Sequence, residues 1–436
     1  MKKLISLILA ITILCSVSAA LAEARQIDGL SDRKIKIHEA GLNATADEML
    51  AQGISPTTGR NLDEVSLNVP DGFLGAAMTG KYLPVMVQVS NSSNGFNSAE
   101  NIATGGDVYK TAPINGEYAD IVYECVQASN GSLSRMTMIF SDVLPDYVGF
   151  IRSTRYTHVR LRQEWGALFL TSGYSEYVTD EWTKYGVPNP MGNKRAEDPG
   201  PVYVGGVGDN KPWRKYYGYL TGISDSNNKL FMLVGPGDDE NLKGLVADPK
   251  TVPENKFEFP NHTWLFTDEL PDGGDSGEII YVTYGHIYQT DSRLEYDEDS
   301  NGYIRYVNVP TIGDQAYCGS RLVGKPTVVA VNGKNDMRKV TAERVAGDPI
   351  IFSNVIIQGI EMKWPGGEIP DPQLVGSGNA DYFMGGQHYE GVWQRKDINS
   401  RTVYYDKDGN EIQLQRGRTL IILMNYNNKT SNVKYE

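Results

Sequence analysis

Two arginines flank a Ser-Thr step in the stretch VGFIRSTRYTHVRLRQEW, which begins at residue 148. The pattern predicts a helix from Thr154 to Trp165, so Arg152 and Arg155 lie at or just before its N-terminus. Free backbone N–H groups and the helix dipole favour an anion there, and guanidinium groups donate paired hydrogen bonds to phosphate or carboxylate. The Ser153 hydroxyl can cap the helix or touch the same anion. This arginine loop is therefore a candidate anion-binding site.

A second interpretation gives the same arginines internal partners. Asp120 and Glu124 lie in the predicted strand ADIVYECV, where alternate residues share one face. If that face meets the arginine loop, the charges form a buried ion-pair network that is structural and needs no ligand. Arg135 begins the next predicted strand and can approach the same edge in either arrangement. The sequence leaves both interpretations open.

Aromatic residues gather in the loop-rich middle of the chain, in DEWTKYG and KPWRKYYGYL. Such rings stack on sugars and anchor protein interfaces, but they also cover small satellite cores beneath loops. The candidates for an aromatic binding surface are Trp182, Trp213, Tyr216 and Tyr217.

Motifs for metal or nucleotide binding are incomplete. YDEDSNGYI has calcium-loop spacing from Asp297, but Asn308 stands where a bidentate Glu is expected. GPGDDENLKG lacks the lysine and serine that end a phosphate-binding loop, and the five histidines have no zinc spacing. We therefore predict no metal, no cofactor and no catalytic residue, and we favour a protein that is not an enzyme.

The first 22 residues are predicted to be an export signal. Lys2 and Lys3 precede the apolar stretch LISLILAITILCSV, and an A-x-A cleavage site ends at Ala22. Leu14 before Cys15 argues against a lipoprotein. Loss of the two lysines changes the formal charge from −13 to −15, which disfavours nucleic acid as a partner. We expect a secreted or envelope-associated chain without a membrane span.

Two cysteines remain in the mature chain, so one disulfide is possible, and the sequence does not decide whether it forms. Cys125 and Cys318 lie far apart in sequence, and Cys125 sits in the strand-like DIVYEC, where a small buried side chain is the favoured role.

The order of elements predicts a mixed α+β chain. After a lead segment, 23–80, which includes a short helix in TADEMLAQG but no strong core, strands and helices alternate through an α/β domain, 81–270. Its end is rich in loops. Short strands with turn signals then predict an antiparallel β domain, 271–436, as a sandwich or partly open barrel. Asp408-Gly409 is a predicted hairpin turn.

Several ordered motifs resemble the YerB-like family (domain of unknown function 3048). They are YLPVMVQVSN, ADIVYE, LSRMTMIF and VGFIRSTR, followed by FSNVIIQ, GVWQR and YYDKDGNEIQLQRGRTLIIL. The resemblance implies an exported envelope protein with an N-terminal α/β domain and a separate β-rich one, and it implies no established activity. QASNGSLSR departs from the family's acidic-Gly-Gly turn, and FLTSGYS lacks a histidine common in the family.

The leading hypothesis is a non-catalytic envelope or extracellular protein that binds wall glycan, an anionic ligand or another exported protein. The alternative is an envelope enzyme that acts on phosphate-containing or glycan polymers through the loop of Arg152 and Arg155.

Overall fold

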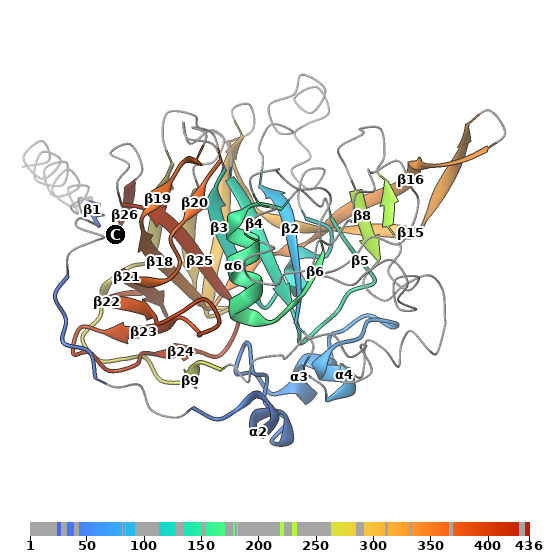
Figure 1. Cartoon of the computed structure of the whole chain (residues 1–436). Coiled ribbons are helices and arrows are strands. Elements are labelled where there is room, and N and C mark those ends of the chain that lie inside the picture. The colour runs from blue at the N-terminus through green and yellow to red at the C-terminus, as the bar shows by residue number, and fades with distance from the viewer. Residues whose placement is uncertain are drawn as a thin grey trace, which may run out of the picture.

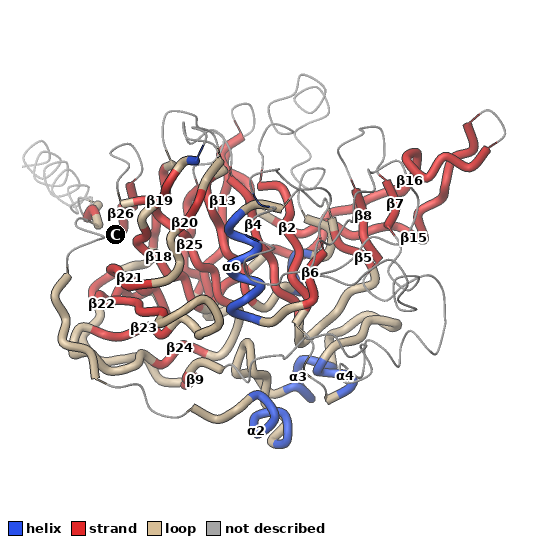
Figure 2. The backbone as a smooth tube through the Cα atoms, viewed as in Figure 1, coloured by secondary structure: helices blue, strands red, loops and turns tan. Residues whose placement is uncertain are grey.

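Strands dominate the protein, and two large sheets pack face to face as a sandwich (Figure 1, Figure 2). No sheet in the described residues closes into a barrel, and a strand-rich fold with antiparallel and mixed sheets is confirmed. The computed structural model describes residues 24–27, 33–38, 43–80, 82, 84–91, 113–127, 134–149, 154–170, 178, 181, 219–221, 229–232, 263–284, 292–309, 313–331, 334–365, 369–426 and 432–436.

The ten-stranded sheet runs in the order β10-β22-β21-β18-β25-β3-β4-β2-β6, and β23 pairs with β22. Its strands are β2 (Val85–Asn91), β3 (Ile121–Val126), β4 (Ser134–Phe140), β6 (Leu168–Leu170), β10 (Asp275–Ser276), β18 (Asn354–Ile360), β21 (Gly376–Met384), β22 (Gln387–Arg395), β23 (Val403–Asp406) and β25 (Thr419–Asn425). β25 is parallel to both β18 and β3. One sheet therefore joins strands from either side of the predicted boundary at residue 270, and its C-terminal part is mixed instead of purely antiparallel.

The central strands of this sheet are buried along their whole length. Every residue of β3, β18 and β25 is buried, as expected for apolar runs covered on both faces. Glu124 and Tyr123 are neighbours in β3, so their side chains point to opposite faces.

The seven-stranded sheet covers the face to which Glu124 points. The Tyr303 ring packs 6.5 Å from the Phe383 ring across the two sheets, and Arg305 pairs with Glu124. Its strands are β1 (Arg25–Gln26), β11 (Ile279–Thr283), β12 (Ser292–Asp297), β13 (Gly302–Val309), β14 (Gly313–Ala316), β17 (Ile351–Phe352) and β26 (Asn432–Tyr435).

Helix α6 (Tyr156–Trp165) covers the opposite face (Figure 2). Trp165 Nε1 donates a 3.0 Å hydrogen bond to the Tyr123 hydroxyl, and Thr157 lies 3.8 Å from the Cys125 sulfur. Gly166 ends the helix in a left-handed conformation, φ 56°. The predicted helix is confirmed, although its N-cap is Arg155, whose side chain makes no capping hydrogen bond.

The lead segment packs more tightly than its sequence suggests. Its helices are α2 (Ala46–Ala51), α3 (Leu62–Ser66) and α4 (Ala76–Thr79). Thr45 caps α2 in a reciprocal box with Glu48, and Gly53 follows the helix with φ 70°, as TADEMLAQG predicts. The loop 55–60, however, inserts Ser55, Thr57 and Thr58 into the core. In the sequence these hydroxyl groups indicate a surface turn. They are buried because carboxylates accept their hydrogen bonds.

A long hairpin, the arm, projects from the sandwich at one end (Figure 1). It is formed by β15 (Cys318–Val331) and β16 (Lys334–Pro349). No helix in the described part of the chain is long and apolar enough to cross a membrane. The remaining short elements are η3 (Gly116–Tyr118), β5 (Tyr147–Val148), β7 (Tyr219–Thr221), β8 (Lys229–Met232), β9 (Leu265–Thr267), β19 (Met362–Lys363), β20 (Asp371–Pro372) and β24 (Gln413–Gln415).

Candidate functional site

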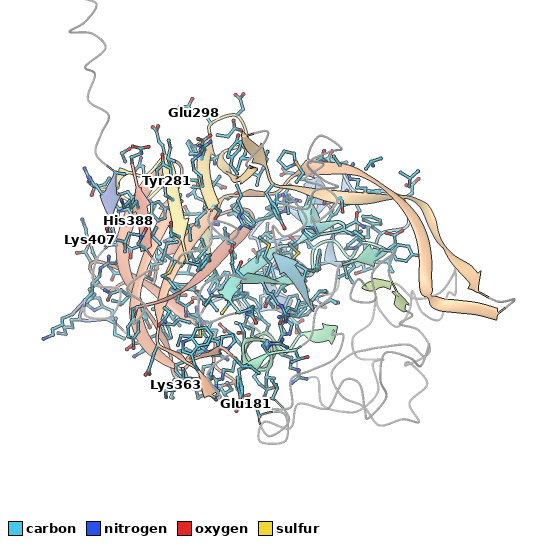
Figure 3. The ribbon with its side chains drawn as sticks, turned by 90° about the horizontal axis from the view of Figure 1, so that it is seen from above. Glu181, Tyr281, Glu298, Lys363, His388 and Lys407 are labelled. Carbon is cyan, nitrogen blue, oxygen red and sulfur yellow. The ribbon has the colours of Figure 1, made fainter. Side chains whose placement is uncertain are left out.

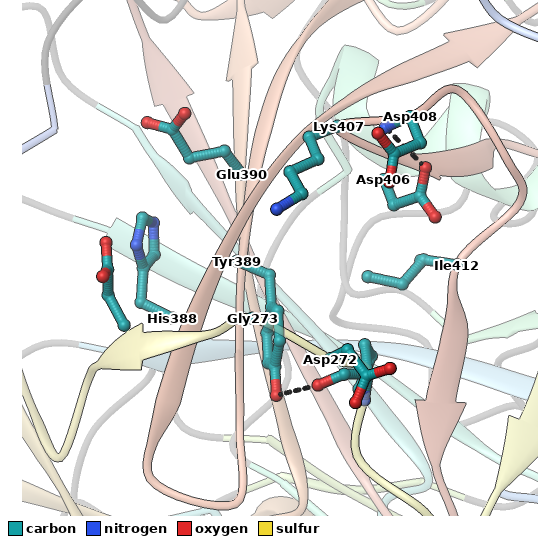
Figure 4. Close-up of a pocket in the computed structure, with 11 residues that line it drawn as sticks. Asp272, Gly273, His388, Tyr389, Glu390, Asp406, Lys407, Asp408 and Ile412 are labelled. Atoms are coloured by element: carbon teal, nitrogen blue, oxygen red, sulfur yellow. Dashed lines mark hydrogen bonds between the residues drawn. The ribbon is translucent and has the colours of Figure 1, made fainter.

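An open cavity of about 340 Å³ lies at the edge of the ten-stranded sheet (Figure 4). Two turns and one strand build it: the turn that precedes β10, the strand β22, and the turn that follows β23. A cavity of this size is within the range of small-ligand sites. We call it the acidic pocket, because five carboxylates line it: Asp272, Asp275, Glu390, Asp406 and Asp408.

The five carboxylates differ in the hydrogen bonds and ion pairs that they make within the protein. Asp406 Oδ1 accepts hydrogen bonds from the backbone N–H groups of Asp408 and Asn410, so this carboxylate shapes the turn. Asp275 pairs with Arg25 at 2.9 Å, and Glu390 pairs with Arg33 at 3.3 Å. The exposed side chains of Asp272 and Asp408 have no hydrogen-bond partner among the described residues. These two can accept hydrogen bonds from a ligand.

Tyr389 and Lys407 give the pocket a ring and one cation. The Tyr389 hydroxyl lies 3.0 Å from the Pro271 carbonyl oxygen and 2.8 Å from Gln387 Oε1. Burial, and then the charge of Asp272, raise the pKa of Tyr389 to about 12, so the phenol stays neutral. Lys407 extends into the space between Glu390 and Tyr389 (Figure 4).

A fixed ion network supports one wall of the pocket. Asp381 Oδ1 accepts hydrogen bonds from Arg33 Nη2 and from His388 Nε2, each at 2.8 Å. The His388 ring lies 4.1 Å from the Tyr435 ring and 4.9 Å from the Phe383 ring. His388 is therefore held as a packed wall residue.

The structure brings two of the predicted arginines to one place. Burial, and then the charges of Arg135 and Arg155, hold the pKa of His158 well below its ordinary value. Burial also lowers the pKa of Arg155. Both arginines therefore lie close to the first turns of α6, an arrangement that either interpretation of the arginine loop allows.

The predicted carboxylate partners lie elsewhere. Glu124 Oε2 lies 3.3 Å from Arg305 Nη2, and Ser134 donates a hydrogen bond to Glu124 at 2.9 Å. Glu124 faces the seven-stranded sheet, whereas α6 covers the other face of β3. Asp120 precedes β3 and accepts hydrogen bonds from the N–H groups of Ser141 and Asp142. Arg152 and Ser153 lie outside the described residues, so their partners stay a prediction.

The aromatic candidates Trp182, Trp213, Tyr216 and Tyr217 also lie outside the described residues. Cys125 is buried and Cys318 is partly buried, and both thiols are free. Burial raises the pKa of Cys125 to about 12, which fits its predicted role as a small core residue. Within the described ranges no three His, Cys, Asp or Glu side chains gather as a metal site.

Sequence reasoning missed the acidic pocket, although a signal was present. PDGGDSG and YYDKDGNE each contain an Asp-Gly turn beside further acids. Each turn reads separately as punctuation between strands. Their functional interest comes from the fold, which places both turns beside β22.

Sequence models of a family described as "Protein of unknown function (DUF3048)" match the chain twice. The N-terminal domain model matches residues 115–229, and the C-terminal domain model matches residues 280–421. This chain belongs to the DUF3048 family. The parallel pairing of β25 with β3 therefore joins the two DUF3048 domains within one sheet.

The crystal structure of YerB protein from Bacillus subtilis is similar to this DUF3048 protein. The TM-score is 0.51 at 17% sequence identity, and the match covers 87% of this chain and 99% of that chain. The similarity shows a shared fold. Comparison with the curated proteins gives no match. The DUF3048 description assigns no activity, so function has to be argued from the site.

Proposed function

We propose that this protein is an exported, non-catalytic protein of the bacterial cell envelope that binds an amine-bearing wall glycan in the acidic pocket. The composition of that pocket carries the proposal. It combines unpaired carboxylates, one lysine, a tyrosine ring and apolar side chains around an open cavity.

A sugar matches the mixture of polar and apolar groups. Its hydroxyls donate hydrogen bonds, which the carboxylates of Asp272 and Asp408 accept. The carbon-bound face of a sugar ring packs on apolar surface, which Tyr389 and Ile412 supply. A few polar groups in a partly apolar cavity are typical of sites that fix the orientation of a small ligand.

The charge balance favours an amine over a neutral sugar. Asp275 pairs with Arg25 and Glu390 pairs with Arg33, so three further carboxylates, Asp272, Asp406 and Asp408, stand against the single ammonium of Lys407 and leave the lining negative. A charge-assisted hydrogen bond from an ammonium to a carboxylate is about twice as strong as a neutral one. A polymer of neutral or acidic sugars gains nothing from that surplus, whereas a deacetylated amino sugar does.

The export signal predicted at residues 1–22 supports a location in the envelope. On this proposal an N-terminal α/β region presents the arginine loop, and the β-rich region carries the acidic pocket.

Replacing two pocket carboxylates is expected to weaken the binding of glucosamine oligomers by at least about tenfold, because each hydrogen bond to a charged group contributes roughly 1.5–3 kcal/mol. The variant is Asp272→Asn with Asp408→Asn. Isothermal titration with a glucosamine tetramer measures the affinity, and the N-acetylated tetramer is expected to bind more weakly.

The control for this experiment is Asp299→Asn, an exposed carboxylate in the β12–β13 turn outside the pocket. It should bind as the native protein does. Equal affinity of the native protein and the pocket variant would refute the assignment of the pocket.

A second candidate is the envelope enzyme or anion-binding protein that uses the arginine loop. The observation that favours it is that Arg135 and Arg155 both lie close to His158 in the first turn of α6, where burial, followed by these two charges, lowers the pKa of that histidine. Guanidinium groups suit a phosphate-containing polymer.

Thermal unfolding with millimolar pyrophosphate separates this candidate from a structural role. A ligand at about a hundredfold its dissociation constant adds roughly 2.7 kcal/mol of stability. We expect Arg152→Ala with Arg155→Ala to abolish that gain while the unliganded melting temperature changes little. A variant that melts much earlier, with no gain in the native protein, would assign these arginines to the fold.

A further inference from the structure

The arm is held firmly at its root and extends away from the sandwich. The Ser320 carbonyl oxygen accepts a hydrogen bond from the Asn115 N–H at 2.8 Å, and the Ser320 N–H donates one to the Pro113 carbonyl oxygen at 3.0 Å. The Glu117 carboxylate sits where a Cβ on Gly319 or Gly347 would overlap it, so a larger residue at either position would displace this carboxylate. These contacts fix the root of the arm on the sandwich.

The outer part of the arm is basic, whereas the whole chain is acidic. Arg321 at the root pairs with Glu117 and Asp348, so its charge is used internally. Between 325 and 339 the chain has one acid, Asp336, in a protein of net charge −13. The basic residues of that outer part are Lys325, Lys334, Arg338 and Lys339.

The strand register sets two of these basic residues apart from the ladder. Val328 pairs with Val340, but the next residue, Val329, pairs with Asp336. Residues 337–339, which include Arg338 and Lys339, therefore form a bulge without partners in the β15–β16 ladder. Bulges bend a strand locally. Two of the four basic residues of the outer part of the arm therefore lie in one irregular step of the strand.

The acidic pocket lies at the opposite end of the molecule. The two views show the arm extending from one end, while β22 with His388 and the turn with Lys407 lie at the other (Figure 1, Figure 3). The arm consequently cannot reach the pocket of its own chain. A second copy presents a pocket of opposite charge to it.

We propose that the basic end of the arm docks on the acidic pocket of a second copy, so that molecules associate head to tail. A strand of 14 residues extends roughly 45 Å at about 3.3 Å per residue. Salt screens charges beyond about 8–10 Å at physiological ionic strength. The negative charge of the sandwich therefore does not neutralise the positive charge at the end of the arm.

The contact is heterologous, because different surfaces of the two copies meet. Such contacts continue into chains or rings instead of stopping at a dimer. The proposal uses the pocket of the proposed function but does not require its glycan. Sedimentation of the protein alone tests the arm, and titration with sugar tests the glycan, so the two failures are distinguishable.

Charge exchange between the two surfaces tests the proposal by sedimentation velocity at several protein concentrations. In dilute salt the native protein is expected to gain average mass with concentration, and about 0.5 M NaCl should weaken association at least about tenfold. Arg338→Glu with Lys339→Glu should be monomeric, because the reversed arm repels the pocket. Asp272→Lys with Asp408→Lys should be monomeric for the converse reason.

An equimolar mixture of the two reversed variants should associate again, since each supplies the charge that the other needs. Lys363→Glu with Lys396→Glu changes the net charge equally on the body and should behave as the native protein. Monomeric native protein, or association that survives the reversed arm, overturns the proposal. So does a mixture that stays monomeric. Native monomers whose arm variant alone loses binding to vesicles of anionic lipid would assign the arm to a membrane surface instead.

Discussion

Replacing Arg305 with Ala is expected to lower the free energy of unfolding by about 3–5 kcal/mol, because it leaves a buried carboxylate without its counter-charge. The Arg305 and Glu124 side chains are 1% and 0% exposed, and their charged groups meet at 3.3 Å. Arg305 comes from β13 and Glu124 from β3, so the pair joins the two sheets. Its guanidinium also lies 4.9 Å from the Tyr317 ring, and this contact is lost as well.

Urea denaturation of three variants measures the effect: Arg305→Ala, a double variant that lacks both charges, and the control Arg293→Ala. Glu124→Gln with Arg305→Met removes both charges, so we expect it to be more stable than Arg305→Ala. Arg293→Ala breaks a partly exposed pair with Glu295 and should cost no more than about 1 kcal/mol. If Arg305→Ala and Arg293→Ala lowered the free energy of unfolding by equally small amounts, the buried pair would not stabilise the sandwich.

Local elements of this fold could be predicted because their signals are local. Alternating and continuous apolar runs predicted β3, β4 and β25, and the Asp408-Gly409 pair predicted a turn in which Gly409 has φ 83°. A helix was predicted from Thr154 to Trp165, and α6 spans Tyr156–Trp165. Each of these features depends on a few neighbouring residues.

The joining of the two family domains could not be predicted, since it depends on partners distant in sequence. β25 and β3 are both apolar strands. Each needs hydrogen-bonded neighbours along its edges as well as side chains packed against both of its faces. Nothing in TLIILMN specifies a parallel neighbour. The partner of Glu124 was unpredictable for the same reason, because Arg305 lies in a strand that packs from the other sheet. The charged residues can be identified in the sequence, but only tertiary packing determines which of them pair.

A buried carboxyl pair at the start of β3 gives the second large effect. Asp120 Oδ2 accepts hydrogen bonds from the N–H groups of Ser141 and Asp142 at 2.7 and 2.9 Å and from the Thr57 hydroxyl at 3.0 Å. Thr58 donates to the Asp142 carboxylate at 2.6 Å. Burial, and then the charge of Asp142, raise the pKa of Asp120 well above its ordinary value.

The direction of this shift fixes the effect of pH. The folded protein holds the Asp120 proton more tightly than the unfolded chain, in which the pKa is about 3.9. The contribution of this group to stability is therefore complete below that value and is lost as pH rises through the raised pKa of the folded state. Deprotonation leaves an anion beside Asp142 in a buried site, which is unfavourable.

Asp120→Asn imitates the protonated carboxyl and is expected to be more stable than the native protein at neutral pH, with little difference near pH 4. The amide oxygen keeps the three accepted hydrogen bonds, and no charge then meets Asp142. Asp120→Ala instead leaves the buried N–H groups of Ser141 and Asp142 without their acceptor and should cost about 2 kcal/mol or more at every pH. Urea denaturation from pH 4 to pH 8 distinguishes the variants. If Asp120→Asn were less stable than the native protein throughout that range, the carboxylate would be ionised in the folded state and stabilised by the nearby arginines Arg60 and Arg418, whose charges act on this carboxyl pair.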